Sequence, residues 1–322
     1  MPVPRKTSLW LLPLVAVAVI AIFFFFRRST PATDVWQRNQ GFIFGTLYNI
    51  TYQYDRDLQT ELEAELKKVD QEFSMFNGES TVARINRGET DVERTPMFNE
   101  VFDLAMRITA DTEGAFDVTV APLVNAWGFG FKHQQLPTPQ QVDSLLQIRS
   151  QMDFAAIAKG YGCDVVARKL QEYGIGNYMI EVGGEIALRG KNSHDEDWRI
   201  GVNKPTEDSL SVHGELQAIL KLTDVCMATS GNYRNFYYKD GRRYAHTIDP
   251  RTGYPVEHEL LSATVIAPNS ATADAYATAF MVLGLDGARK VLSRHPDMKA
   301  YLIYTNQDGE FAVWHSQGLD IE

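Results

Sequence analysis

A run of predicted strands with no helix among them most constrains the fold of this chain. The strands cover about residues 178–182, 186–188, 198–203 and 216–222, and a further strand covers residues 260–267. Parallel strands need a long crossover connection, usually a helix, whereas antiparallel strands can be joined by short turns. Strands and helices are therefore segregated along the chain, which predicts an α+β fold rather than a doubly wound parallel sheet.

Apolar residues at helical spacing predict helices on both sides of this run. Leu58, Leu62, Leu66, Val69 and Phe73 form one stripe, which is typical of a helix that buries one face in the core. Further helices are predicted over about residues 98–112, 138–149, 159–174, 272–283 and 286–294.

Two shorter segments complete the expected elements. Residues 41–54 are rich in aromatic and β-branched side chains and are predicted to form a single strand with a glycine kink. Asn77-Gly78 predicts a turn, after which Ser80 can cap a short helix.

Charge and cysteine content exclude several classes of function. The formal net charge is −10 over 322 residues. Residues 1–28 carry basic side chains and no acid, so the remainder is more acidic still. Such a domain is a poor candidate for binding nucleic acid or an anionic membrane surface. Only Cys163 and Cys226 are present, so we expect a buried pair of free thiols rather than a disulfide scaffold or a thiolate metal site.

Leu9 to Phe26 form an uncharged apolar run of 18 residues, just long enough to span a bilayer as a helix. Four phenylalanines lead straight into Arg27-Arg28 without the small residues of a cleavage site, which favours an uncleaved anchor. A cleaved signal peptide, cut near Ala32, is the alternative. The predicted organisation is an anchor and linker over residues 1–33 and one domain over residues 34–322.

The segment Tyr244-Ala-His-Thr-Ile-Asp-Pro-Arg-Thr-Gly-Tyr254 places an imidazole before a rigid turn. Pro250 fixes its own φ, and Gly253 can take the positive φ that closes a turn. His246 can take and return a proton near neutral pH, so it is a candidate general base. The alternative is a well-formed turn with a hydrogen-bonded histidine, in which Asp249 caps its own backbone instead of orienting the ring.

Asp274 and Thr278 are four residues apart in a predicted helix and so lie on one face of it. Two such oxygen atoms suit Mg²⁺, which prefers few protein ligands and completes its shell with water and phosphate oxygens. The alternative is a helix cap and its neighbour.

Other segments carry weaker signals for a phosphate-bearing or flat aromatic ligand. Lys159-Gly160 lies at a predicted helix start, where a lysine and free backbone amides can hold a phosphate. Residues 114–130 combine an isolated Asp117 with glycines around Trp127 and Phe129, which suits a flat aromatic ligand or, equally, an aromatic core plug. The chain contains neither a P-loop nor a Gly-x-Gly-x-x-Gly fingerprint after a strand.

Six motifs in a fixed order are more specific than any one of them. They are Gly114-Ala-Phe-Asp117, Asp153-x-x-Ala-x-Ala-Lys-Gly160, Gly183-Gly184, Thr229-Ser-Gly231, His246-x-Ile-Asp-Pro-x-Thr-Gly253 and Ala273-Asp-Ala-x-Ala-Thr278. In this order they resemble the FAD:protein FMN transferases, the ApbE-like flavin transferase family. The resemblance covers about residues 41–315.

The resemblance implies an α+β, T-fold-like domain with mixed or antiparallel sheets and packed helices. The apolar run Leu9–Phe26 places one predicted N-terminal transmembrane helix before it. It also implies FAD as the substrate, Mg²⁺ as the cofactor, and transfer of the FMN half of FAD to a threonine hydroxyl of another protein, with release of AMP. An FAD pyrophosphohydrolase, in which water replaces the threonine, and a flavin-binding protein without turnover are the alternatives.

By matching positions, the resemblance assigns a role to each candidate residue. The metal ligands would be Asp274, Thr278 and the carbonyl of Ala156, and the base would be His246. FAD would contact Ala115, Phe116, Asp117, Asp153, Lys159 and Ile248. Phe44 and Phe76 stand where family members often have methionine and tyrosine beside the flavin, and Glu185 stands where aspartate is usual.

The expected location follows from the N-terminal segment together with the resemblance. The apolar helix replaces the lipid-anchor cysteine that is common in the family, so we expect an inner-membrane protein with a periplasmic catalytic domain. The acceptor is expected to be a threonine-bearing flavoprotein, such as a membrane electron-transfer subunit, and no nucleic acid is expected as a partner.

Overall fold

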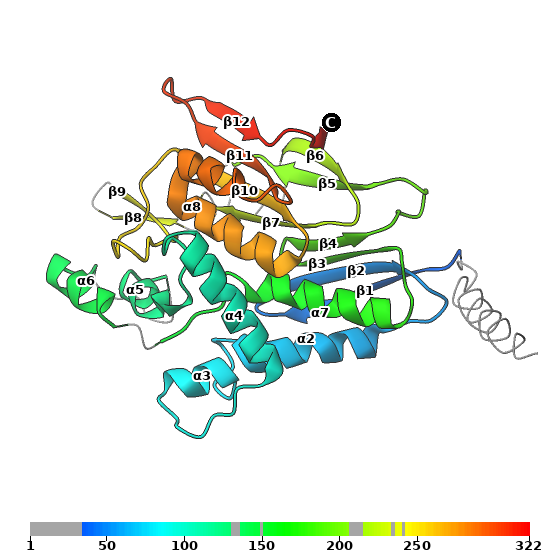
Figure 1. Ribbon diagram of the computed structural model, residues 1–322, viewed down its shortest axis with the longest axis horizontal. Helices are drawn as coiled ribbons and strands as arrows, with labels where there is room; N and C mark the ends of the chain where they lie inside the picture. Colours follow the sequence, from blue (N-terminus) through cyan, green and yellow to red (C-terminus); the bar gives the residue numbers. More distant parts are fainter. Residues whose placement is uncertain (1–33, 130–135, 149–150, 206–214, 233–235, 240–241) are drawn as a thin grey trace, which may run out of the picture.

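The computed structural model describes residues 34–129, 136–148, 151–205, 215–232, 236–239 and 242–322. An eight-stranded sheet with the order β1-β2-β3-β4-β7-β10-β11-β12 forms its centre, and every neighbouring pair in it is antiparallel (Figure 1). The prediction of an α+β fold with antiparallel sheets is confirmed.

The strands of this sheet come from both halves of the chain. Their bounds are β1 Trp36–Ile43, β2 Thr46–Gln53, β3 Tyr178–Val182, β4 Glu185–Arg189, β7 Cys226–Gly231, β10 Leu260–Ala267, β11 Lys299–Thr305 and β12 Phe311–His315. A second sheet has the order β13-β6-β5, with β5 Trp198–Asn203, β6 Leu216–Leu222 and β13 Asp320–Ile321. β8 Phe236–Lys239 and β9 Arg242–Ala245 form a separate hairpin.

Helices cover one face of the large sheet, and the small sheet packs on the other (Figure 1). The helices are α2 Gln59–Phe73, α3 Thr81–Asn86, α4 Pro96–Asp111, α5 Ala121–Ala126, α6 Pro139–Leu146, α7 Ala158–Glu172 and α8 Ser270–Leu292, with a short 3-10 helix at Val118–Val120. The predicted stripe from Leu58 to Phe73 is fully buried along α2. Ser80 caps α3 with its side chain, as expected, and Thr138 caps α6.

The prediction of a single strand over residues 41–54 is wrong. The segment is a hairpin whose turn lies at Phe44 and Gly45, both at positive φ. Positive φ at both central residues is the conformation of the tight turn that joins twisted antiparallel strands. The composition that favoured one strand fits two equally well, because aromatic and β-branched residues favour any strand.

The carboxyl-terminal helical region matches the prediction, whereas one hairpin elsewhere does not. The region labelled α8 consists of two helices that meet at a kink at Gly284, whose φ of 70° is not helical, so the prediction of two helical segments is confirmed. The β8–β9 hairpin is not among the predicted elements. Cys163 and Cys226 are buried free thiols, as expected.

Tight packing between α7 and α8 positions the site. A side chain at Gly160 would collide with the carbonyl oxygen of Ser270 at the start of α8. The Asp164 carboxylate of α7 accepts hydrogen bonds from the backbone amides of Ser270 (2.7 Å) and Ala271 (2.9 Å), two of the amides that a helix start leaves without an internal partner. The first turns of the two helices are therefore held side by side.

The described residues contain no helix that is long and apolar enough to cross a bilayer. The predicted anchor Leu9–Phe26, with the linker up to residue 33, lies outside the described residues.

Candidate active site

Two adjoining cavities lie where α7, α8, the β3–β4 turn and the segment around His246 meet. The larger has a volume of about 500 Å³ and is lined by Lys159, Glu185 and Asp274 among others. The smaller has a volume of about 140 Å³ and a mainly apolar lining. Ala155, Ala156, His246 and Thr278 line both cavities, so the two form one divided site.

Lys159, Glu185 and Asp274, which we call the Asp274 cluster, form the charged wall of the larger cavity. The Lys159 ammonium lies 2.9 Å from Oε1 of Glu185 and 3.7 Å from Oδ2 of Asp274. The backbone amide of Gly160 donates to Oδ2 of Asp274 at 3.1 Å. Asp274 is 2% exposed and Glu185 is 4% exposed, so the cluster places two carboxylates and one ammonium in a region of low solvent access.

Burial and mutual charge shift the pKa values of this cluster. Burial raises the pKa of Glu185, the ion pair with Lys159 opposes this by favouring the ionised carboxylate, and the neighbouring Asp274 adds to the rise. For Lys159, burial lowers the pKa, but the carboxylates of Asp274 and Glu185 outweigh it and raise the pKa above the usual range. Lys159 is therefore a permanent cation at the cavity wall, where it can pair with a phosphate.

Asp274 and Thr278 project into the same cavity from one face of α8, as their spacing predicts. Asp274 is not a helix cap, because Asn269 caps α8. The Thr278 hydroxyl lies 3.2 Å from the hydroxyl of Ser230 on β7. The alternative of a cap and its neighbour is therefore wrong for this pair.

The residues present fit a hard divalent cation. Asp274 and Thr278 offer a carboxylate and a hydroxyl at the wall that Ala156 also lines, and all-oxygen sets of this kind suit Mg²⁺. Oε2 of the buried Glu185 has no hydrogen-bond partner, which leaves further negative charge beside them. In the described part of the chain, no three His, Cys, Asp or Glu side chains form a metal cluster, and a set with a single carboxylate would not form one.

His246 reaches both cavities from the turn that the sequence predicts. The Gly253 amide donates to the Asp249 carbonyl at 2.8 Å, and Gly253 has a φ of +78°. The Asp249 carboxylate accepts hydrogen bonds from the backbone amide of Arg251 and from Nε and Nη2 of its guanidinium. This supports the alternative in which Asp249 caps its own turn, while the His246 ring lies edge-on to Phe129 at 6.4 Å between centroids.

Ala115, Phe116, Asp117, Asp153 and Ile248 line the smaller cavity, and their contact with FAD stays a prediction. The Asp153 amide donates to the Val118 carbonyl at 2.7 Å, which joins two segments that are distant in sequence. Burial raises the pKa of Asp153. Trp127 lies behind this wall as part of an apolar cluster, and its indole donates to the Gly253 carbonyl at 2.7 Å. The loop thus supplies both a cavity wall and a core plug.

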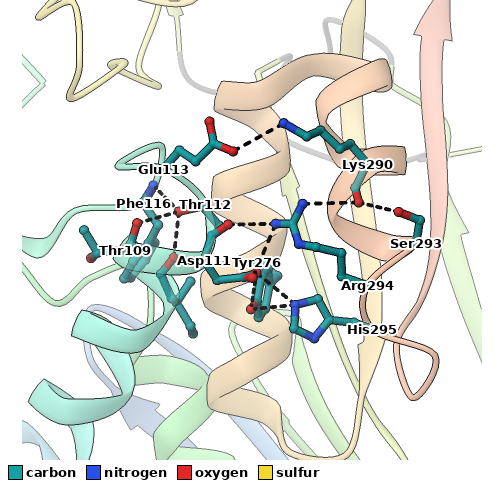
Figure 2. A network of polar contacts seen from close by, with 11 residues as sticks. Thr109, Asp111, Thr112, Glu113, Phe116, Tyr276, Lys290, Ser293, Arg294 and His295 are labelled. Atoms are coloured by element: carbon teal, nitrogen blue, oxygen red, sulfur yellow. Dashed lines mark hydrogen bonds and ion pairs between the residues drawn. The ribbon is translucent and has the colours of Figure 1, made fainter.

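A polar network holds the loop before this wall against α8 (Figure 2). Oδ2 of Asp111 accepts a hydrogen bond from the Tyr276 hydroxyl at 2.8 Å and lies 2.9 Å from Nε2 of His295. Arg294 donates to the Asp111 carbonyl at 2.8 Å. We call these four residues the Asp111 cluster, and it anchors the end of α4 from which residues 112–117 lead into the cavity.

Phe44 and Phe76 are the two predicted site residues that do not line either cavity. Phe44 lies in the β1–β2 turn and packs against Gly162 of α7. Phe76 follows α2 and is 81% exposed. Their roles beside a flavin stay predictions.

The structure adds Glu185, Ser230 and Gly160 to the site. Glu185 follows the Gly183-Gly184 motif and Ser230 lies in the Thr229-Ser-Gly231 motif, so the motifs mark these regions of the sequence but give no role to the two side chains. Lys159-Gly160 is predicted as a helix start with free amides for a phosphate, but in the structure the Gly160 amide binds the Asp274 carboxylate. These contacts depend on long-range packing, of β4 against α7 for Glu185 and of α7 and β7 against α8 for Gly160 and Ser230.

The model of the ApbE family matches residues 44–302. The chain is 36% identical over 303 residues to an FAD:protein FMN transferase of Haemophilus influenzae, covering 84% of this chain and 86% of the relative. It is 34% identical over 321 residues to an FAD:protein FMN transferase of Salmonella typhimurium, covering 90% of each.

Solved structures give the same result. The flavin transferase ApbE from Vibrio cholerae superimposes with a TM-score of 0.78 at 34% identity, covering 88% of this chain and 97% of that one. The apo form of the Pseudomonas stutzeri flavinyl transferase ApbE gives a TM-score of 0.76 at 30% identity, covering 88% and 95%. The chain therefore belongs to the ApbE family.

Proposed function

We propose that this protein is an FAD:protein FMN transferase, which moves the FMN half of FAD to a threonine hydroxyl of an acceptor flavoprotein and releases AMP. The observation that carries the proposal is that His246, Lys159, Asp274 and Thr278, from three separate segments, line one cavity. The names of the relatives support FAD as the donor and a protein as the acceptor.

The chemistry divides among these residues. The acceptor hydroxyl is a weak nucleophile at its own pKa, so His246 removes its proton as the new bond to phosphorus forms. The bond between that phosphorus and the bridging oxygen breaks, and the bridging oxygen leaves with AMP. Lys159 offsets the negative charge that develops on the phosphates.

Asp274, Thr278 and the carbonyl of Ala156 would hold a Mg²⁺ ion in this proposal. When bound, the ion neutralises charge on the pyrophosphate oxygens. The residues of the smaller cavity, including Phe116 and Ile248, would hold an apolar part of FAD and keep water from it.

A single incubation tests the proposal. The purified full chain is mixed with FAD, Mg²⁺ and a threonine-bearing acceptor flavoprotein, and the acceptor is weighed by mass spectrometry. A gain of one FMN, with AMP released in equal amount, is the expected result. Release of FMN and AMP without a gain would indicate an FAD pyrophosphohydrolase, and unchanged FAD would indicate a flavin-binding protein.

We also propose that the domain is held at the periplasmic face of the inner membrane by Leu9–Phe26. The support is the length and apolar character of that segment. Protease treatment of spheroplasts should degrade the domain, whereas a protein that is protected in spheroplasts, or released as a soluble form cut near Ala32, would contradict the proposal.

A further inference from the structure

The Asp274 cluster contains one ammonium between two carboxylates, and its distances are unequal. Lys159 forms a close ion pair with Glu185 at 2.9 Å but lies 3.7 Å from Asp274. Glu185 is the first residue of β4, whereas Lys159 and Asp274 lie on α7 and α8. The strand therefore supplies a charge that draws the ammonium away from the α7–α8 contact.

An ammonium and a divalent cation compete for the same carboxylate. At a separation of about 4 Å, two positive charges repel strongly where solvent access is low. Asp274 is the only carboxylate in the proposed ligand set, so a lysine paired closely with it would oppose metal binding. Glu185 has the charge, the burial and the position to prevent this.

We propose that Glu185 is a positioning residue, which holds Lys159 off Asp274 and so keeps Asp274 available to a divalent cation. This inference rests on the metal role proposed for Asp274. It differs from a direct ligand role for Glu185, in which the carboxylate itself would bind the ion. The unpartnered Oε2 of Glu185 makes the direct role the main competitor.

The positioning role and the ligand role of Glu185 predict different metal affinities in a variant that lacks Lys159. If Glu185 acts through Lys159, its charge no longer matters once Lys159 has been removed. If Glu185 is a ligand, its charge matters equally in both backgrounds. A double-mutant cycle on metal affinity separates the two.

The experiment uses Mn²⁺ as the probe and follows the free ion by electron paramagnetic resonance, with the full chain alone and at saturating FAD. Glu185→Gln should weaken Mn²⁺ binding about tenfold, the scale on which outer-shell partners act. Lys159→Met should not weaken it, and the double variant should match Lys159→Met within about twofold. Glu185→Asp keeps the charge and should retain most of the affinity.

Glu181→Gln is the matched control, because Glu181 lines the same cavity from the neighbouring strand β3. It removes one negative charge without touching the Lys159 pair, so it should leave Mn²⁺ affinity within about twofold of the wild type. An equal loss in Glu181→Gln and Glu185→Gln would overturn the inference, because it would assign the effect to net charge.

Three further outcomes would each contradict the inference or the metal site on which it rests. A loss of affinity from Glu185→Gln in the Lys159→Met background would overturn the positioning role in favour of a direct ligand. No loss in either background, while Asp274→Ala abolishes binding, would remove Glu185 from the metal site and leave the proposed function standing. Wild-type protein that binds Mn²⁺ no better than Asp274→Ala would instead overturn the proposed metal site itself.

Discussion

Two polar clusters lie on opposite sides of the same helix, and they differ in how completely their hydrogen bonds are satisfied. Asp274 and Tyr276 are two residues apart on α8, which turns their side chains about 200° away from each other. Asp274 faces the larger cavity, whereas Tyr276 binds Asp111 on the far side (Figure 2).

We call the Asp111 cluster closed, because groups of the protein itself satisfy its carboxylate. Burial raises the pKa of Asp111, but hydrogen bonds from Tyr276 and His295 outweigh it and hold the pKa below its ordinary value. Arg294 occupies the other carboxylate oxygen at 3.3 Å. The carboxylate is thus satisfied as an anion by groups of the protein alone.

We call the Asp274 cluster open, because its buried carboxylates are not fully hydrogen-bonded within the protein. Glu185 keeps one buried oxygen without a partner, and its pKa is raised instead of lowered. Proteins rarely leave buried polar atoms unpaired, and perturbed carboxylates in a cavity are frequent at functional sites. The comparison indicates that one side of α8 is built for stability and the other for a ligand.

Replacing His246, which lines the same cavity as Asp274, should give the largest effect on activity. His246→Ala should lower the rate of FMN transfer by about 10²–10⁴-fold, the usual contribution of a general base, while FAD affinity and the melting temperature stay close to the wild type. Single-turnover kinetics and fluorescence titration with FAD measure the two quantities. Unchanged turnover would remove His246 as the base.

Replacing Asp274 should act on the metal more than on the fold. Asp274→Ala should raise the Mg²⁺ concentration for half-maximal activity by at least about 10-fold to 100-fold, since ligands matter at least as much as outer-shell groups. Activity measured across a Mg²⁺ titration checks this. An unaltered titration would mean that Asp274 serves only to accept the Gly160 amide.

Replacing Asp111 should show the opposite pattern. Asp111→Ala leaves Tyr276, Arg294 and His295 without their shared acceptor, so we expect the free energy of unfolding to fall by about 2–3 kcal/mol. The Mg²⁺ titration of the variant should match the wild type at a temperature where it is folded. A large change in metal dependence without a loss of stability would break the distinction between the two sides of α8.

The arrangement on the Asp274 side of α8 could be predicted from the sequence better than that on the Asp111 side, because it depends on residues that are close together in the chain. Asp274 and Thr278 share a face at a spacing that any helix imposes. The partner of Tyr276 is Asp111, 165 residues earlier in the chain, and no spacing rule connects them. The Lys159–Glu185 pair likewise exists only because β4 packs against α7.

The same reasoning explains the errors near the amino terminus of the domain. The positive φ of Phe44 and Gly45 depends on how β1 and β2 pair, so composition alone could not separate a kinked strand from a hairpin. The His246 turn was predictable because Pro250 and Gly253 fix the backbone locally. Its contact with the cavity was not, since α8 must fold beside it.

Asp111 and Asp164 both form hydrogen bonds to residues of α8. Their contributions to the free energy of unfolding should change with pH in opposite directions, and this is the smallest of the expected effects. The pKa of Asp111 is lower in the folded protein, so its contribution to stability is present above the unfolded pKa of about 4 and is lost as the pH falls through the folded value. Burial raises the pKa of Asp164 to about 6. Its ionisation therefore costs stability as the pH rises from about 4 to 6.

The expected differences are of the order of 1 kcal/mol after allowance for solvent screening, and denaturant unfolding between pH 3.5 and about 7 measures them. Asp164→Asn should lose less stability than the wild type between about pH 4 and 6. Asp111→Asn should lie below the wild type at neutral pH and approach it in acid. Parallel curves for both variants would mean that neither carboxylate titrates differently in the fold, and the contrast in their surroundings would then have no energetic consequence.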